Sequence, residues 1–370
     1  MTVYIARAGD SVSGVARSFN IEPGVLAQVN QLSDPSHLTS GLALLIPSPD
    51  SSPLWSGMEL NICASCAVRA GAFSLLLPQA TYLCSFSAEA LPNGAIATSD
   101  DQAPAQAATA AQVLPLLTVS NYDSARGGFS AETAHRLLSD DSAQSAFFDD
   151  LLSRIETRTY GGAAFDFQYI YPFEREAYSR FLSRASDTLH PLGAYFFAFA
   201  PPKTEDDPHS LISGAHDYAA LGQYCDRVIV HSAQRSGGQP PAVSRIGEVL
   251  EYASGRIAAG KVLADISPRG GSRVLGGETR PLSPAAAAAL AVSTGAEIKY
   301  DALSRTARFT YKDALNRPCT AWFEDVRSTL EKLRLALALG SAGLSLWCVN
   351  LLHRPTAELI LSTTDTEKIL

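Results

Sequence analysis

The chain has 370 residues, enough for two domains, and its 46% hydrophobic and 18% charged residues predict a well-buried core and argue against general disorder. A formal net charge of −8 argues against nucleic acid as the main partner, because phosphate backbones are bound by basic surfaces, and a neutral glycan or small molecule fits better. No apolar run has the length of a membrane span, and the six cysteines, with one lone C-x-x-C at Cys63 and Cys66, lack zinc spacing, so we expect no metal or other cofactor.

The first 48 residues predict a small βααβ unit. Residues 3–7 and 41–47 are the predicted strands, and residues 9–20 and 22–30 contain the predicted helices. Asp10 or Ser11 is a suitable N-cap for the first helix, and Pro23 suits the first turn of the second. A run of turn-forming residues follows, which predicts a linker over residues 49–54.

This unit resembles a LysM domain over nearly its full length. The resemblance is carried by residues of both strands, both helices and the turns, namely Tyr4, Gly9, Asp10, Ser11, Val15, Ala16, Leu26, Asn30, Leu38, Gly41, Leu44, Ile46 and Pro47. LysM domains bind polymers of N-acetylglucosamine such as peptidoglycan and chitin. The resemblance implies a sugar groove between two loops, formed by Gly9, Asp10, Ser11, Asn30, Gln31 and Leu32. The alternative is that these residues only determine the turns of the fold.

From residue 55 to residue 370, eight near-continuous apolar runs alternate with amphipathic helices. Such runs are typical of parallel strands that are covered on both faces, so the pattern predicts a (β/α)8 barrel of the α/β class. The predicted strands are residues 58–64, 81–87, 113–120, 163–168, 194–200, 226–232, 261–267 and 343–349. Residues 132–158 and 244–257 are typical of the helices, and the Ala-rich stretches 102–112 and 283–292 favour surface helices. The interval from about 270 to 325 holds further short strand patterns, which predict a small α+β insertion.

The candidate site lies at the end of the fourth predicted strand, where Asp166 and Gln168 occur two residues apart. Side chains at i and i+2 of a strand point to the same side, and the chemistry of such barrels sits at the carboxyl ends of the strands. We therefore expect both side chains to face the barrel interior at its functional end.

Residues 55–360 resemble glycoside hydrolase family 18, in the branch of LysM-bearing spore-cortex-lytic N-acetylglucosaminidases. The resemblance is carried by residues 81–87, 160–170, 175–184, 197–204, 215–230, 296–301, 321–328 and 343–349. Family enzymes use an Asp-x-Glu pair at the fourth strand end. The Glu protonates the leaving oxygen, and the Asp orients the substrate's acetamido group, which attacks the anomeric carbon. By this resemblance Asp166 is the orienting Asp, and Gln168 replaces the acid.

Gln168 cannot act as that acid, because a neutral amide has no proton to release at a useful pKa. Other family positions differ as well. His231 and Ala233 replace a Met-x-Tyr on the sixth strand, Arg269 replaces a Tyr on the seventh, and Gly161 and Ala164 replace earlier acidic or amide positions. Several differences together favour a naturally degenerate site over a single laboratory substitution or a misaligned motif.

Trp347 ends the last predicted strand, where the family places a Trp beneath the sugar ring. The alternative is that Trp347 belongs to the barrel core and that Asp166 is a structural carboxylate. His231 and Arg269 are candidates to pair with Asp166 or to bind an anionic group such as a lactyl carboxylate.

Three functions remain open at this point. The favoured one is binding of peptidoglycan-type or chitin-type glycan by a LysM domain and a barrel that has lost hydrolysis. The others are a glycosidase, active or weakly active by substrate-assisted retention or through another acid, and a structural barrel that binds no sugar. The first residues lack the features of a signal peptide, so we expect delivery to a spore cortex, coat or cell envelope by another route, with a cytoplasmic location as the alternative.

Overall fold

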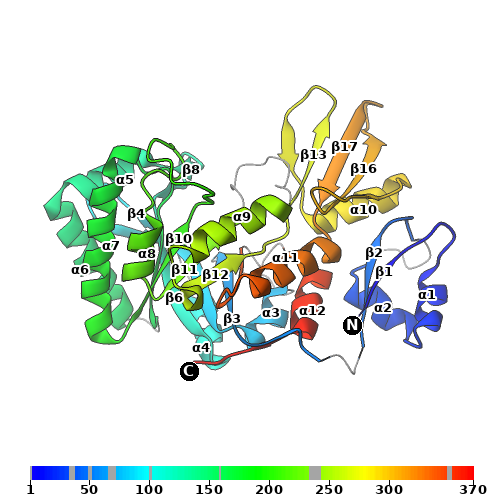
Figure 1. Cartoon of the computed structure of the whole chain (residues 1–370), viewed down its shortest axis with the longest axis horizontal. Coiled ribbons are helices and arrows are strands. Elements are labelled where there is room, and N and C mark those ends of the chain that lie inside the picture. Colours follow the sequence, from blue (N-terminus) through cyan, green and yellow to red (C-terminus); the bar gives the residue numbers. More distant parts are fainter. Residues whose placement is uncertain are drawn as a thin grey trace.

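The computed structural model describes residues 2–32, 38–48, 52–65, 72–99, 102–157, 160–232, 243–347 and 352–370. Figure 1 shows a barrel, an insertion above it, and a small N-terminal domain at its side. Within the described ranges, no helix combines the length and apolar character that a membrane crossing requires.

The eight predicted barrel strands are present, all parallel, and the pairing of the first with the second closes the barrel. In chain order they are β3 (Trp55–Ser65), β4 (Tyr82–Ala90), β6 (Leu114–Ser120), β9 (Gly162–Asp166), β10 (Tyr195–Ala200), β11 (Arg227–His231), β12 (Val262–Asp265) and β18 (Gly343–Leu346). The helices that accompany them are α3 (Ala72–Leu76), α4 (Gln102–Ala110), α5 (Ala131–Ser139), α6 (Asp141–Thr157), α7 (Arg175–Leu189), α8 (Tyr218–Tyr224), α9 (Val243–Ser254), α11 (Val326–Ala338) and α12 (Arg354–Thr363). The predicted (β/α)8 barrel is confirmed.

The prediction of one helix over residues 132–158 is wrong, because α5 and α6 are separate helices. Asp140 between them has an extended backbone, and its Oδ1 accepts hydrogen bonds from the backbone nitrogens of Ser142 (2.8 Å) and Ala143 (3.2 Å). Such a carboxylate satisfies the unpaired N–H groups of a new helix. The hydrophobic pattern continues through this cap, and for that reason it indicated a single helix.

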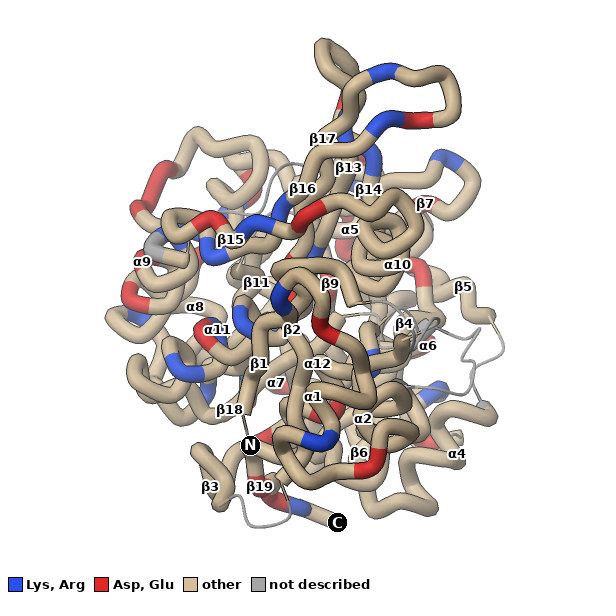
Figure 2. Tube along the Cα trace, turned by 90° about the vertical axis from the view of Figure 1, so that its right-hand side faces the viewer, with Lys and Arg blue, Asp and Glu red and all other residues tan. Residues whose placement is uncertain are grey.

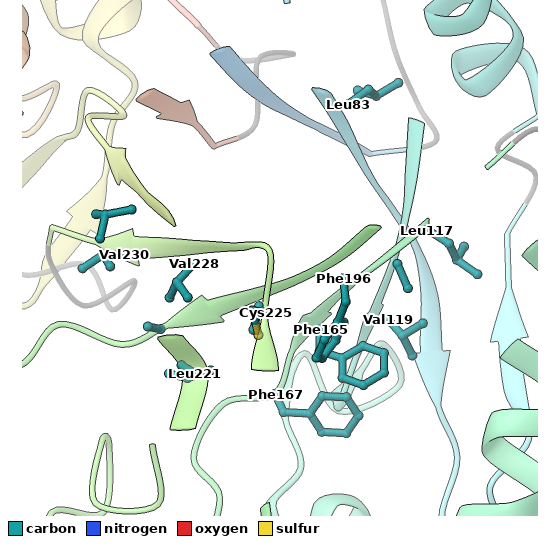
Figure 3. Packing of buried hydrophobic residues seen from close by; sticks show 14 of the residues in the cluster. Leu83, Leu117, Val119, Phe165, Phe167, Phe196, Leu221, Cys225, Val228 and Val230 are labelled. Carbon is teal, nitrogen blue, oxygen red and sulfur yellow. The ribbon is translucent and has the colours of Figure 1, made fainter. Parts of the chain in front are cut away.

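Side chains along β9 point alternately to the inside and the outside of the barrel, and this alternation sets the direction of Asp166. Phe165 and Phe167 point outward into the core between strands and helices, where they pack with Phe196 and Phe181. Figure 3 shows Phe165, Phe167 and Phe196 gathered on this outer side. Ala164 belongs instead to the cluster inside the barrel. Asp166 therefore lies on the inner side, as the period of two requires.

The predicted insertion between β12 and α11 is an antiparallel sheet with one helix. Its strands lie in the order β14 (Thr279–Pro281), β13 (Gly270–Val274), β17 (Pro318–Phe323), β16 (Thr306–Lys312) and β15 (Lys299–Asp301). The helix α10 (Pro284–Thr294) covers it with Ala287 and Ala291, so this Ala-rich run is a packed helix.

The N-terminal domain consists of residues 2–48 as far as they are described. β1 (Thr2–Ile5) pairs antiparallel with β2 (Ala43–Ile46), and α1 (Val12–Ser18) and α2 (Pro23–Val29) lie between them in the chain. Ser11 is the N-cap of α1, since its Oγ accepts from the backbone nitrogen of Gly14 at 3.1 Å. Half of the predicted linker, residues 49–51, lies outside the described residues, and the domain boundaries stay predictions.

The N-terminal domain is packed against the rest of the chain. Ala43 and Leu45 of β2 share an apolar cluster with Val326 of α11 and Leu359 of α12. Its own core also continues into the insertion, where it meets Ile298 and Phe309 among others. Figure 2 looks onto this side, with the N-terminal domain in front of α11 and α12 and beneath the insertion strands. The two parts are therefore joined by a packed interface as well as by the chain connection, which the sequence pattern did not indicate.

Gly41 brings the N-terminal domain close to the insertion. The backbone nitrogen of Ile298 donates to the carbonyl of Ser40 at 2.9 Å. Gly41 has a φ of +86°, and a Cβ added there would lie 1.8 Å from the carbonyl oxygen of Ile298. Only glycine allows this approach.

We predict that Gly41→Ala destabilises the protein more than Gly9→Ala does. Gly9 has nearly the same φ, +88°, but an added Cβ there meets nothing within 4 Å. Both substitutions introduce backbone strain, which costs about 1–3 kcal/mol, and only Gly41→Ala adds a steric clash worth about 1–3 kcal/mol more. Denaturant unfolding of the two variants measures the difference. Equal losses of unfolding free energy would contradict the close contact at Ile298.

Candidate functional site

A cavity of about 770 Å³ opens at the carboxyl ends of the barrel strands. Its walls combine aromatic rings, hydroxyl groups and two carboxylates, contributed by Phe86, Ser87, Ala88, Glu89, Ala97, Thr98, Ser99, Ser120, Tyr122, Ser124, Phe129, Asp166 and Trp347. Tyr122 and Phe129 come from the short hairpin of β7 (Tyr122–Asp123) and β8 (Gly128–Phe129). The volume falls in the range of small-ligand sites, about 300–1,000 Å³.

Asp166 and Gln168 meet at this end of the barrel, as predicted. Asp166 is the last residue of β9 and is fully buried, and Gln168 follows the strand and is nearly buried. The Nε2 of Gln168 donates a hydrogen bond to Oδ1 of Asp166 at 2.7 Å. The Gln168 amide therefore donates a hydrogen bond to Asp166. By the family resemblance, Asp166 is the carboxylate that orients the substrate's acetamido group.

Asn121, immediately after β6, fixes the backbone of Gln168. Its Oδ1 accepts from the Gln168 backbone nitrogen at 2.8 Å, and its Nδ2 donates to the Gln168 carbonyl at 2.8 Å and to the Ser130 carbonyl at 3.0 Å. The residue at position 168 is thus held by paired hydrogen bonds from the neighbouring strand end. No sequence motif pointed to Asn121.

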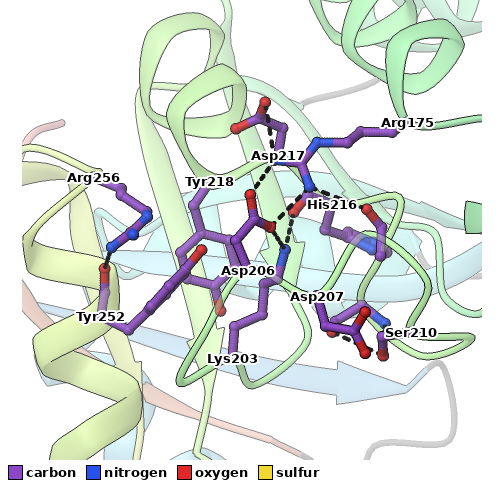
Figure 4. Close-up of polar contacts among 12 residues, drawn as sticks. Arg175, Lys203, Asp206, Asp207, Ser210, His216, Asp217, Tyr218, Tyr252 and Arg256 are labelled. Carbon is purple, nitrogen blue, oxygen red and sulfur yellow. Dashed lines mark hydrogen bonds and ion pairs between the residues drawn. The ribbon is translucent and has the colours of Figure 1, made fainter.

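A polar network holds the other side of the same segment, in the loop after β10. His216 is fully buried, and its Nε2 lies 2.8 Å from the carbonyl of Phe167. Lys203 donates to the His216 carbonyl at 3.0 Å and to Asp206 at 2.7 Å, and Asp206 also accepts two hydrogen bonds from Arg175. Figure 4 shows these side chains converging. The network ties the start of α7 and this loop to the residue that precedes Gln168.

Two groups of the network have shifted pKa values. Burial lowers the pKa of His216 to about 4. The hydrogen bond from Arg175, followed by the contact with Lys203, holds the pKa of Asp206 well below its ordinary value. His216 is consequently neutral at neutral pH, and Asp206 is charged.

Trp347 follows β18 and lines the cavity, and its contact with a sugar ring stays a prediction. Its ring meets that of Phe86 edge-on, with centroids 4.0 Å apart at 89°. Its backbone nitrogen donates to Oγ of Ser267 at 2.6 Å. The ring is half-buried and supported from behind, which suits a platform for an apolar sugar face.

His231 and Arg269 both lie beside Asp265. Nδ1 of His231 is 2.9 Å from Oδ2 of Asp265, and Nη2 of Arg269 is 3.7 Å from the same oxygen. Burial raises the pKa of Asp265, but the hydrogen bond and charge of His231, with Arg269 and Ser267, outweigh burial and leave that pKa below its ordinary value. Neither His231 nor Arg269 is among the described residues that line the cavity, and sugar contact by either stays a prediction. Ala233 lies outside the described residues.

Glu324 and Asp325 have structural partners at the base of the insertion. Glu324 forms a buried ion pair with Lys332 at 2.7 Å and accepts from the backbone nitrogen of Arg269 at 2.7 Å. Asp325 caps α11 by accepting from the backbone nitrogens of Arg327 and Ser328. These contacts give both residues a structural role.

The six groove residues predicted in the N-terminal domain fall into two sets. Gly9, Asp10 and Ser11 form an exposed or half-exposed turn, in which Asp10 accepts from the Tyr4 hydroxyl at 2.7 Å and from the Arg7 backbone nitrogen at 2.8 Å. The second set is Asn30, Gln31 and Leu32. Its member Asn30 is buried, and the three described hydrogen bonds of its side chain go to backbone groups of Leu26 and Leu45.

Gln31 and Leu32 lie where the N-terminal domain meets other parts of the chain. The side-chain oxygen of Gln31 accepts from the backbone nitrogen of Arg354, at 3.2 Å, and Leu32 packs at the edge of the core shared with the insertion. Sugar contacts by the six residues stay predictions. Within the described ranges, no group of three or more His, Cys, Asp or Glu side chains is arranged to hold a metal ion.

Glu89 is a cavity residue that sequence reasoning missed. It stands near the end of β4, pairs in register with Ser120 of β6, and Ser120 pairs with Asp166 of β9. The rule that strand ends carry function, applied to the second strand, is the signal that would have found it.

Known proteins share both parts of this architecture. Residues 4–47 match the LysM domain family. The cortical fragment-lytic enzyme of Bacillus subtilis (strain 168) is 30% identical to this chain over 95% of each protein. The chain belongs to the family of cortical fragment-lytic enzymes.

Solved structures agree with this assignment. The crystal structure of the spore cortex-lytic enzyme SleL of Bacillus megaterium QM B1551 is similar with a TM-score of 0.79 and 26% identity, covering 100% of this chain and 88% of SleL. A chitinase from Chromobacterium violaceum ATCC 12472 has the same barrel fold, with a TM-score of 0.74 and 24% identity over 83% of this chain and 99% of the chitinase. The chain thus combines a carbohydrate-binding LysM domain with a glycosidase-like barrel related to spore cortex-lytic enzymes.

We predict that the free energy of unfolding falls as pH decreases from about 6.5 to about 4. His216 has its ordinary pKa of 6.5 when unfolded and a pKa of about 4 when folded. Below pH 6.5 the unfolded chain therefore binds the extra proton, and the stability present above that pH is lost at up to about 1.4 kcal/mol per pH unit.

Denaturant unfolding across this range checks the prediction. His216→Gln lowers stability and makes the pH dependence shallower, because one titrating group is gone. A residual slope remains, since burial also lowers the pKa of His353 to about 4. His209→Gln is the control, since His209 is exposed and its loss leaves the slope unchanged. An unaltered slope in His216→Gln would rule out this assignment.

Proposed function

We propose that the protein binds N-acetylglucosamine-containing glycan of the peptidoglycan or chitin type, through its LysM domain and barrel cavity, without hydrolysing it. The observation that carries the proposal is the hydrogen bond from the Gln168 amide to Asp166. The position that holds the acid in family 18 enzymes holds here a group that donates to the neighbouring carboxylate and releases no proton. The protein acts in the spore cortex, coat or cell envelope, in keeping with the names of its relatives.

The loss of hydrolysis follows from the energetics of the acid step. General acid catalysis contributes on the order of 10²- to 10⁴-fold to such reactions. In addition, the Oδ1 of Asp166 already accepts from Gln168, so it is less available to orient an acetamido group. Both effects act on bond cleavage, and neither prevents a sugar from entering the cavity.

The retained cavity supports binding. Four aromatic residues and several serine hydroxyls line it, and pyranose rings present apolar faces edged by hydroxyl groups. Stacking and a few hydrogen bonds give micromolar to millimolar affinity, roughly −8 to −4 kcal/mol. The LysM domain, packed on α11 and α12, adds a second binding element in a fixed position on the same body.

A working glycosidase is the second candidate, and Glu89 is the observation that favours it. Glu89 is the other carboxylate among the described residues of the cavity wall, two strands from Asp166. Two strand spacings separate their Cα atoms by roughly 10 Å. This Cα separation is compatible with the distance between the two carboxyl groups of inverting glycosidases, about 6.5–9.5 Å. In those enzymes the second carboxylate activates water.

We predict that Trp347→Ala weakens glycan binding by about 1–3 kcal/mol, because the ring is lost as a stacking platform. Isothermal calorimetry of the full chain with chito-oligosaccharides and muropeptides measures the loss. Tyr224→Ala is the matched control, since Tyr224 is a partly buried aromatic residue of α8 that does not line the cavity. If Trp347→Ala binds as tightly as the unsubstituted protein, the barrel is a structural element and the LysM domain alone binds glycan.

We predict that the unsubstituted protein releases no N-acetylglucosamine from cortex fragments and that Gln168→Glu releases it slowly. A Glu at 168 would lie within hydrogen-bond distance of Asp166, and two adjacent carboxyl groups share a proton, which restores an acid. The differences at His231 and Arg269 remain, so the rate stays below that of an active relative assayed in parallel.

Gln168→Ala is the control for this gain of hydrolysis, since it removes the amide without supplying an acid. Hydrolysis by the unsubstituted protein that Glu89→Gln abolishes would establish the second candidate function instead. If Gln168→Glu hydrolyses glycan as fast as an active relative, the residue at position 168 alone accounts for the loss of hydrolysis.

A further inference from the structure

We infer that the barrel cavity prefers a hexosamine whose amine is free and charged over its N-acetylated form, and that Glu89 recognises this ammonium group. The inference rests on the proposed function, because it names the sugar class that the same cavity takes.

Glu89 is placed to reach a ligand in the cavity. It stands on β4 in register with Ser120, which is in register with Asp166, so the three residues form one row across neighbouring strands. All three line the cavity. The described contact of the Glu89 carboxylate is a long one, 3.4 Å from Oγ of Ser124 at the rim. Glu89 is half-buried, so its charge is partly shielded from solvent and remains accessible from the cavity.

The charged residues described in the cavity wall are all acidic. Its described lining residues include the two carboxylates of Glu89 and Asp166 and no Lys, Arg or His. Basic residues nearby pair with carboxylates outside the cavity wall. Arg126 pairs with Asp123 at 3.2 Å, and Arg154 pairs with Asp150 at 2.7 Å. His231 and Arg269 lie beside Asp265. An ammonium group entering this wall gains Coulomb attraction, and a lactyl carboxylate is repelled.

The chemistry of an ammonium group fits the acceptors in this row. It offers three N–H donors, and the carboxylate of Glu89 and the neighbouring hydroxyls of Ser120 and Ser124 accept hydrogen bonds. Charge-assisted hydrogen bonds of this kind are about twice as strong as neutral ones. The aromatic rings of Tyr122, Phe129 and Trp347 in the same wall add cation–π attraction. An acetamido group has one N–H and no charge, so it gains less from the same wall.

The test compares a glucosamine tetramer with its fully N-acetylated counterpart on the full chain, by calorimetry in mildly acidic, low-salt buffer. The signal that Trp347→Ala removes is assigned to the barrel cavity, which separates it from binding at the LysM domain. We expect the glucosamine tetramer to bind the cavity about tenfold more tightly than the acetylated tetramer, and Glu89→Gln to remove this preference. Added salt should reduce the preference as well.

Glu205→Gln is the matched control, because Glu205 is an exposed carboxylate outside the cavity wall. Equal or tighter cavity binding of the acetylated tetramer, unaffected by Glu89→Gln, would overturn the inference and leave the proposed function intact. If neither tetramer gives a signal that depends on Trp347, both the inference and the barrel's part in the proposed function are wrong.

Discussion

The hydrogen bond between the Gln168 amide and Asp166 is the contact on which the functional account depends. A glycosidase site of this type needs one carboxyl group that carries a proton and another that stays ionised. Under the proposed function the first is replaced by the Gln168 amide, which donates a hydrogen bond to the second. Under this proposal the barrel keeps the position and shape of a sugar site and lacks the most direct route to protonating a leaving oxygen.

The surroundings hold this pair firmly in place. Asn121 holds the backbone of Gln168 from the strand on one side, and His216 holds the carbonyl of Phe167 from the loop on the other. The LysM domain is likewise held, since β2 packs on α11 and α12 and Gly41 lies against Ile298. Under the proposed function, a glycan meets two binding elements whose relative position is set by packing.

The fold was predictable because it depends on local patterns. Continuous apolar runs marked all eight barrel strands, and Asp166 and Trp347, which were singled out by their strand-end positions, both line the cavity. The surroundings of the site depend on contacts between distant residues, such as Asn121 with Gln168 and Glu89 with the row of Ser120 and Asp166. Nothing in the local sequence indicates these pairings. The docking of the LysM domain was missed for the same reason, since Ala43 and Leu45 are typical of any short buried strand.

The most direct measurement is a crystal structure of the unsubstituted protein after prolonged soaking with an N-acetylglucosamine-containing tetrasaccharide. The account predicts an intact chain, with one sugar ring against Trp347 and its neighbours in the cavity that Glu89 and Asp166 line. A shortened product in that cavity would show that the barrel still hydrolyses glycan. An empty cavity under saturating ligand would show that the barrel does not bind it.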